Sequence, residues 1–299
     1  MVASEDVPRL RVVATVGMVA DLVRQIGGED VEVTQLIGSG IDPHLYRPTR
    51  SDIAALMAAE AVFYCGFKLE GRLADVLERM ARDGRNVIAV VETLLPERML
   101  VHEGVPDPHA WMDVSLWMEA AGVVERSLSR FDPARAPRYA ERAAAYHEQL
   151  RELDEYAQEV LSTVPSSARL LVTAHDAFHY FGRAYGFEVV GIQGVSTESE
   201  AGLERIGKLV DTLVERRVPA VFVETSVSDR NVLALIEGAS ARGHAVALGP
   251  ALYSDAMGPD GTYEGTYIGM IDHNVTSIAR ALGGAPPPSG FRGWKEGRP

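Results

Sequence analysis

The sequence has little of what several classes of protein require. Only one of its 299 residues is a cysteine, Cys65, so the chain forms no internal disulfide and no metal cluster of cysteine ligands. Cys65 lies in the apolar run 61–65, which favours a buried thiol. No apolar run reaches the ~18 residues that a membrane span needs. The first ten residues, MVASEDVPRL, lack the apolar core of a signal peptide, which indicates a cytoplasmic protein unless a targeting segment has been removed.

Positive charge and aromatic side chains are also sparse. The chain has 29 Lys and Arg residues against 42 Asp and Glu, which gives a net charge of −13. This balance disfavours nucleic acid and anionic membranes as partners and favours the attraction of small cations. The aromatic content of 7% gives little support to a wide cleft for an organic or chelated-iron ligand. With 46% hydrophobic residues, the chain has enough apolar material for one large domain or two ordinary ones.

A long helix is predicted in the middle of the chain, over residues 132–164. Asp132 can cap it, Pro133 suits its first position, and Pro165 ends it without an intervening glycine. A helix of about 30 residues spans roughly 45 Å. Apolar residues recur at spacings of three and four, which gives one apolar stripe: Tyr139, Ala143, Tyr146, Leu150, Leu153, Ala157, Val160 and Leu161. An ordinary surface helix or a coiled coil is the alternative.

Strand and helix patterns alternate on both sides of this helix. Strands are expected at 11–16, 31–37, 61–65, 86–92, 169–173, 187–192, 220–224 and 244–249. Helices are expected near 19–26, 49–60, 70–82, 114–129, 177–185, 199–216, 229–242 and 263–282. Alternation of this kind predicts parallel sheets covered on both faces. Capping boxes are expected at Thr49–Asp52 and Thr197–Glu200.

We therefore predict an α/β fold with two lobes, each a roughly four-stranded parallel sheet flanked by helices, joined by one long backbone helix. The N-terminal lobe covers residues 1–131, the helix 132–164, and the C-terminal lobe 165–299. The Pro- and Gly-rich tail from about residue 284 is expected to be poorly ordered. The two halves show no sequence repeat.

Four candidate metal ligands follow predicted strands, where open α/β sheets bind ligands. His44 follows the second strand and His109 the fourth. His175 follows the first strand of the second lobe directly, and Asp255 lies shortly after the fourth. Three imidazoles and one carboxylate suit Zn²⁺ and can also hold Mn²⁺ or Fe²⁺. Singly, each histidine is more often structural, but two of them stand in Asp-Pro-His tripeptides, whose proline stiffens the loop.

Carboxylates beside these histidines have two possible roles. They can accept a hydrogen bond from the ring nitrogen that does not bind metal, or they can cap turns. The residues concerned are Asp42, Asp107, Asp113 and Asp176. Glu198, Glu200 and Glu224 can also face the cleft.

Competing motifs are weaker. His175 and His179 have the spacing of the H-E-x-x-H helix of zinc proteases, but an aspartate replaces the glutamate and His175 stands at the helix start. We therefore interpret His179 as a surface or packing residue and a metal-dependent hydrolase as the minority alternative. The glycines around Ser39 are a weak dinucleotide signal. Three further histidines lack companions at useful spacing and are expected to be solvated or in the core: His102, His147 and His244. His273 is expected on the last helix, where packing is favoured and support of a metal ligand is the alternative.

The motifs GSGIDPHLYRPT, DPHAWMD, LLVTAHDAFHYFGRAYGF, GVSTESEA, VFVETSVS and LYSDAMG, followed by GTYEGTYIGMIDHNV, occur in this order. Over Val12 to about Leu282 the chain resembles the metal-binding solute receptors of zinc/manganese ABC transporters, in particular the TroA-like branch. The resemblance implies two α/β lobes joined by one long helix. It also implies that the metal ligands are His44, His109, His175 and Asp255.

The same resemblance implies a function without catalysis: capture of Zn²⁺ or Mn²⁺ outside the inner membrane and delivery to an ABC permease. Fe²⁺ is a further possible cargo. Such receptors are periplasmic or attached to the cell surface, often through an N-terminal lipid-bearing cysteine that this sequence does not contain. We expect a monomer with the permease and the metal as partners. In the stretch just before the second ligand, LLPERMLVHEGVPD, His102 is the one histidine, so a metal-collecting histidine loop is not expected. A receptor for chelated iron or an organic ligand is the remaining alternative.

Overall fold

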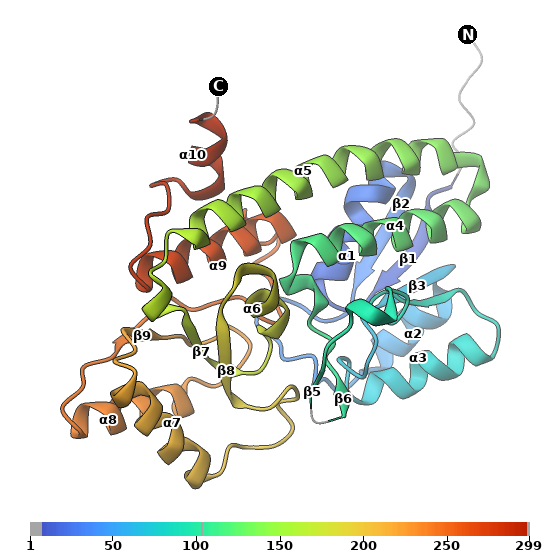
Figure 1. The fold of residues 1–299 in the computed structure, drawn as a ribbon. Helices are drawn as coiled ribbons and strands as arrows, with labels where there is room; N and C mark the ends of the chain where they lie inside the picture. Colours follow the sequence, from blue (N-terminus) through green and yellow to red (C-terminus); the bar gives the residue numbers. More distant parts are fainter. Residues whose placement is uncertain (1–7, 103, 298–299) are drawn as a thin grey trace.

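A computed structural model describes residues 8–102 and 104–297, and in it two α/β lobes lie side by side under one long helix, α5 (Figure 1). The predicted fold class is confirmed. The predicted outer limits of the lobes, residues 1 and 299, lie outside the described residues. Within the described part of the chain, no helix is both long and apolar enough to cross a membrane.

The N-terminal lobe contains one parallel sheet of four strands in the order β2-β1-β3-β4. Its strands are β1 (Leu10–Ala14), β2 (Val31–Gln35), β3 (Ala61–Tyr64) and β4 (Val87–Ala89). Its helices are α1 (Gly17–Gly27), α2 (Arg50–Ala58), α3 (Arg72–Arg82) and α4 (Val114–Phe131). Alternate residues of β1 point to opposite faces: Val12 packs with the cluster that contains α1 and α4, whereas Val13 packs with α2 and α3. The sheet is therefore covered on both faces.

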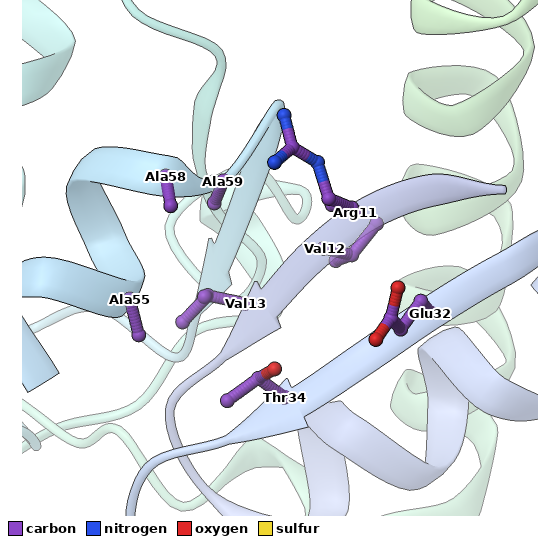
Figure 2. Close-up of a pocket in the computed structure, with 8 residues that line it drawn as sticks. All are labelled: Arg11, Val12, Val13, Glu32, Thr34, Ala55, Ala58 and Ala59. Atoms are coloured by element: carbon purple, nitrogen blue, oxygen red, sulfur yellow. The ribbon is translucent and has the colours of Figure 1, made fainter. Parts of the chain in front are cut away.

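The start of α2 follows the predicted capping box. The backbone N–H of Asp52 donates to the side-chain oxygen of Thr49, and the backbone N–H of Thr49 donates to the Asp52 carboxylate at 2.6 Å. Figure 2 shows a hollow of about 110 Å³ between this helix and the sheet. Its lining contains one acidic side chain, Glu32, and no histidine, so it offers no ligand set for a metal ion.

Helix α5 (Ala136–Ser162) begins later than predicted. A 3₁₀ turn over Pro133–Arg135 precedes it, and Asp132 does not cap it. The Asp132 carboxylate instead accepts hydrogen bonds from Arg135 at 2.6 Å and from the Tyr139 hydroxyl at 2.9 Å. The predicted apolar stripe is buried except for the half-buried Ala143, and it packs on α1 and α4 at one end and on α9 at the other. The helix thereby connects both lobes.

The C-terminal sheet is less regular than predicted. Its strands are β7 (Leu170–His175), β8 (Glu188–Gln193), β9 (Ala220–Val221) and β10 (Ala247–Leu248), paired as β7-β8 and β9-β10, both parallel. The backbone N–H of Phe222 donates to Val172 at 2.9 Å and joins the two pairs. The ladder stops near Pro250, which has no N–H to donate, and resumes as a bridge between Glu224 and Leu252.

The helices of this lobe are α6 (His179–Tyr185), α7 (Leu203–Glu215), α8 (Arg230–Ala241), α9 (Tyr267–Ala281) and α10 (Gly290–Glu296). Two predictions about α7 are wrong, its first residue and its capping residue. Helix α7 starts at Leu203 instead of 199, so Thr197 is no capping residue; its hydroxyl donates to Asp42 at 2.6 Å.

The tail beyond residue 284 is also ordered up to the last described residue. Phe291 and Trp294 of α10 pack with their rings 5.4 and 5.8 Å from that of Tyr156, and the backbone N–H of Phe291 donates to Asp272 at 2.8 Å. The short antiparallel hairpin of β5 (Val101–His102) and β6 (Val105–Pro106) was not predicted from the sequence.

Candidate metal centre

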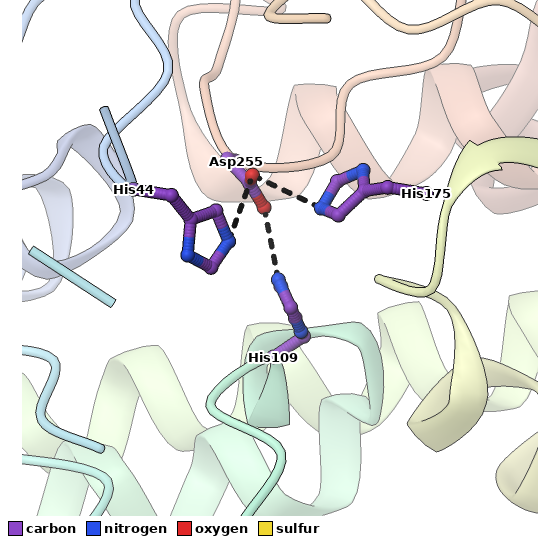
Figure 3. Close-up of side chains that lie close together, drawn as sticks. All are labelled: His44, His109, His175 and Asp255. Carbon is purple, nitrogen blue, oxygen red and sulfur yellow. Dashed lines mark ion pairs between the residues drawn. The ribbon is translucent and has the colours of Figure 1, made fainter. Parts of the chain in front are cut away.

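The four predicted ligands meet between the lobes (Figure 3). His44 and His109 come from the N-terminal lobe, and His175 and Asp255 come from the C-terminal lobe. The Nε2 atoms of His175, His109 and His44 lie 3.1, 3.3 and 3.6 Å from the nearer carboxylate oxygen of Asp255. The ligand atoms of all four residues lie within 4.8 Å of one another, and each residue is at least 96% buried.

Strand ends and a few close contacts hold these side chains. His175 is the last residue of β7, and His109 directly precedes the 3₁₀ turn Ala110–Met112 that leads into α4. His44 lies in the loop after β2, against Gly71, where an added Cβ would collide with the His44 carbonyl oxygen. Asp255 lies in the loop after β10, and the indole N–H of Trp111 donates to the carbonyl of the preceding residue at 2.9 Å.

Five polar atoms at the centre of this group have no hydrogen-bond partner in the part of the chain that the structure describes. They are the Nε2 atoms of the three histidines and both carboxylate oxygens of Asp255. Buried polar atoms without partners are costly and therefore rare in folded proteins. One cation at their midpoint would satisfy all of them at once. Three imidazole nitrogens and a carboxylate are a ligand set for Zn²⁺, Mn²⁺ or Fe²⁺, so the donor set fits a transition metal.

Two of the imidazoles have a carboxylate against Nδ1, the ring nitrogen that points away from the centre. Asp107 lies 2.7 Å from Nδ1 of His109 and accepts its backbone N–H at 3.0 Å. Glu224 lies 2.6 Å from Nδ1 of His175 and accepts its backbone N–H at 2.9 Å. Such pairs fix the ring and direct the Nε2 lone pair toward a metal. Asp42 accepts the backbone N–H of His44 at 2.9 Å instead of a ring N–H.

The other proposed carboxylate partners have structural roles. Asp113 caps α4 through the backbone N–H groups of Ser115 and Leu116. Asp176 accepts the backbone N–H of Gly191 at 2.6 Å. The role of Glu224 was visible in the sequence only as a carboxylate at a strand end that could face the cleft.

Charges within the group shift the pKa values of its members in opposite directions. Burial lowers the pKa of His44 to about 3. Burial also opposes protonation of His109, but the carboxylates of Asp107 and Asp255 outweigh it and raise the pKa to about 9. In the same way, Glu224 and Asp255 overcome burial and raise the pKa of His175. Burial favours neutral Asp255, yet His175 and His109 hold its pKa well below the usual value.

The centre borders a cavity of about 370 Å³ between the lobes. His44 is the one member of the four-residue group in its lining, which also includes Lys68, Arg72, Ser196 and Glu198. An ion entering along this side would meet the neutral imidazole of His44 first.

The remaining histidines divide into two groups. His244 and His273 each lie within hydrogen-bond distance of a backbone carbonyl, at 2.9 and 2.8 Å, and His147 is exposed on α5. These agree with a structural or solvated role. His102 and His179 lie together beside Asp107, although the sequence suggested no companion for His102 and only His175 for His179. Because His175 belongs to a strand, it does not form with His179 the one-helix pair of zinc proteases.

Known proteins resemble this chain over most of its length. The family model for ZnuA, described as the periplasmic component A of the zinc-uptake complex, matches residues 12–281. The chain belongs to this family. It is 44% identical over 277 residues to the manganese-binding lipoprotein MntA of Bacillus subtilis, covering 92% of this chain and 90% of MntA.

Solved structures give the same result. The periplasmic zinc-binding protein TroA of Treponema pallidum has a TM-score of 0.89 and 44% identity to this ZnuA-family chain, over 92% of this chain and 99% of TroA. Fe(III)-bound YtgA of Chlamydia trachomatis has a TM-score of 0.84 and 28% identity, over 92% and 99%. These relatives differ in the metal that their names state.

Proposed function

We propose that this ZnuA-family chain binds one divalent transition metal ion, Zn²⁺ or Mn²⁺, through His44, His109, His175 and Asp255, and delivers it to an ABC-type importer. The observation that carries the proposal is the set of five buried ligand atoms that converge without hydrogen-bond partners. The names of the relatives, which include zinc-, manganese- and iron-binding proteins, support the same class of cargo.

The donor set favours zinc at equilibrium. Nitrogen-rich sites bind Zn²⁺ more tightly than Mn²⁺ in the usual order of stability of divalent ions. The cargo in the cell then depends on which metal is available. Metal binding needs neutral imidazoles, so protons compete with the metal at His109 and His175, whose pKa values are raised. Affinity should therefore fall as the pH falls.

Transport of the ion fits better than catalysis on it. A metallohydrolase needs a metal-bound water and a nearby general base. Four protein ligands fill a tetrahedral shell, and Glu224, the carboxylate nearest to His175, is held by that residue's ring and backbone. A receptor for chelated iron or an organic molecule needs more room than four buried ligands within 4.8 Å leave.

The location follows from the family. Relatives are named as lipoproteins or periplasmic proteins, so we place this chain at the cell surface or in the periplasm, with a membrane permease as its partner. Acidic side chains on the lobes are candidates for the contact with the permease.

Release is proposed to need a small movement. Behind the site, hydrogen bonds connect the lobes: the Tyr267 backbone N–H donates to Asp21 at 3.1 Å, the Tyr267 hydroxyl to Trp111 at 2.7 Å, and the Tyr180 hydroxyl to Asp107 at 3.0 Å. These bonds and α5 favour a modest rocking in which His175 and Asp255 withdraw from the other two ligands. Metal-free and metal-bound crystal structures that differ by a large hinge rotation would contradict this.

The test is metal analysis of the purified protein, followed by calorimetric titration with Zn²⁺ and Mn²⁺. The wild type should bind one ion tightly, and His109→Ala should abolish tight binding. His147→Ala, which removes an exposed imidazole from α5, is the matched control and should bind as the wild type does. Tight binding by His109→Ala, or none by the wild type, would refute the proposal.

A further inference from the structure

A second group of metal-ligating side chains lies on the far side of Asp107 from the main centre. It consists of His102, Asp107 and His179, each of which offers one ligand atom within 4.8 Å of the others. The Asp107 Oδ2 atom lies 3.7 Å from Nε2 of His102 and 3.5 Å from Nδ1 of His179. The group is separate from the four residues of the main centre.

Both lobes contribute to this group. His102 lies on the hairpin strand β5, and Asp107 follows the hairpin in the loop that presents His109. His179 is the first residue of α6 in the C-terminal lobe. The Tyr180 hydroxyl donates to the backbone carbonyl of Asp107 at 3.0 Å and fixes α6 against this loop. The arrangement therefore depends on the contact between the lobes, as the main centre does.

The two oxygens of Asp107 have different environments. Oδ1 accepts the backbone N–H of His109 and lies against its Nδ1, whereas Oδ2 is buried, faces the second group and has no hydrogen-bond partner among the described residues. Asp107 as a whole has no exposed surface. Nδ1 of His179 is likewise buried without a hydrogen-bond partner. A fully buried carboxylate oxygen without a partner is costly, and a cation between it and the imidazoles would satisfy it.

We propose that His102, Asp107 and His179 form a second binding site for a divalent transition metal, with Zn²⁺ as the best-fitting ion. Two imidazoles and one carboxylate are a zinc ligand set, and water completes the shell where protein ligands number three. The His102 and His179 side chains are 34% and 17% exposed, so the group lies close to solvent although its ligand atoms are buried. The Asp176 carboxylate lies 3.6 Å from Nε2 of His179, which is beyond hydrogen-bond distance but adds a second negative charge near that ring.

One rearrangement is needed for both imidazoles to bind the same ion. Their rings are stacked, with centroids 3.7 Å apart and planes inclined by 24°, whereas a metal must lie in the plane of each ring. The torsion that turns an imidazole about its Cβ–Cγ bond is broad, so the partly exposed ring of His102 can turn its edge toward the ion. His179, at the start of α6, and the buried Asp107 stay in place.

The shared carboxylate couples the two sites. A cation on Oδ2 of Asp107 draws charge away from Oδ1, which then supports His109 less well as a ligand of the main centre. Each ion therefore weakens the binding of the other, and by linkage the effect is equal in both directions. The second site fills only when free metal exceeds what the main centre requires.

The test measures the number of Zn²⁺ ions bound per chain by equilibrium dialysis and elemental analysis over a range of buffered free Zn²⁺. The wild type should reach two ions per chain in two separate steps. His179→Ala and His102→Ala should each keep the tight step and lose the weaker one, so that both end at one ion. His147→Ala is the control for the loss of an imidazole and should still bind two.

A spectroscopic measurement separates the proposed ligands from nonspecific surface binding. Protein that already holds one Zn²⁺ is titrated with Co²⁺, whose visible absorption reports imidazole ligands in a low-coordinate site. The band should appear in the wild type and in His147→Ala and be absent from His102→Ala, which alters a partly exposed hairpin residue and keeps the test valid if His179→Ala does not fold. A wild type that stops at one ion, or a second step that persists in both variants, would overturn the proposal.

Discussion

Replacement of Glu224 by glutamine tests whether a buried carboxylate tunes the main centre through His175. Glu224 is 4% exposed. Its Oε2 atom lies 2.6 Å from Nδ1 of His175, and its Oε1 atom accepts the backbone N–H of His175 at 2.9 Å. Glutamine has the same shape but one acceptor oxygen, and its amide group faces one of the two N–H donors. The imidazole then loses its negative partner or its orientation.

The expected loss can be given a size. Removal of a carboxylate that supports a metal-binding histidine usually costs about 10- to 100-fold in metal affinity, or about 1.4–2.8 kcal/mol. A second effect opposes it, because Glu224 also raises the pKa of His175 and so favours the proton that competes with the metal. The net loss should therefore be smaller near neutral pH and larger at alkaline pH, where proton competition fades.

The assay is calorimetric titration of Glu224→Gln with Zn²⁺ in the presence of a competing chelator, at a neutral and an alkaline pH. Glu237→Gln removes the same charge from the exposed face of α8 in the same lobe and should bind as the wild type does. If Glu224→Gln binds Zn²⁺ as tightly as the wild type at both pH values, the carboxylate does not tune the centre and the reasoning fails.

Three further predictions concern protons and loop geometry. Zn²⁺ binding at pH 7 should release about two protons, one each from His109 and His175, as measured by calorimetry in buffers of different ionisation enthalpy; release of none would contradict the raised pKa values. The melting temperature of the metal-free protein should fall by several degrees as the pH rises through about 9. The pKa of His109 is raised from 6.5 to about 9, so its protonated form stabilises the fold fully below pH 6.5 and no longer above pH 9. An unchanged melting temperature would contradict this. Gly71→Ala should weaken Zn²⁺ binding about tenfold or more by displacing His44, whereas Gly84→Ala, which also has a positive φ but open space around it, should not; equal affinity of the two variants in titrations would refute the displacement.

The sequence predicts the fold wherever local patterns and long-range packing agree. The strands of the N-terminal sheet, the capping box at Thr49 and the long helix all carry local signals that the structure retains. The predictions fail where tertiary contacts override the local signal. Asp132 and Thr197 both look like helix caps, but each carboxylate or hydroxyl finds a partner elsewhere, Arg135 and Asp42 respectively.

The tail shows the same effect in the opposite direction. Its proline and glycine content predicts disorder, and nothing local predicts α10. Helix α10 is held by a ring contact between Phe291 and Tyr156, which lies more than 130 positions earlier in the chain, and by a hydrogen bond to Asp272. Composition reports the cost of ordering a segment, whereas the partner that offsets this cost is visible only in three dimensions.

The candidate site was easier to predict than its supports. Its four members could be named because parallel strands present their carboxyl ends at one edge. Proximity in sequence identifies one supporting carboxylate, Asp107 beside His109, but not the other. Asp176 is adjacent to His175 but bonds Gly191, whereas Glu224, 49 residues away, holds the ring. A strand that neighbours β7 in space provides the carboxylate, and that neighbour is set by topology.

The charges of the centre also determine how a metal ion exchanges with protons there. At neutral pH, ionised Asp255 lies between two imidazoles whose raised pKa values keep them protonated, while His44 is neutral. A divalent ion that displaces these two protons brings the same charge that they carried, so the net charge of the buried group does not change. The attraction that holds Asp255 against both lobes is therefore present before and after binding. A small opening between the lobes suffices for this exchange, because the buried Asp255 carboxylate has positive charge beside it both with the protons and with the metal ion.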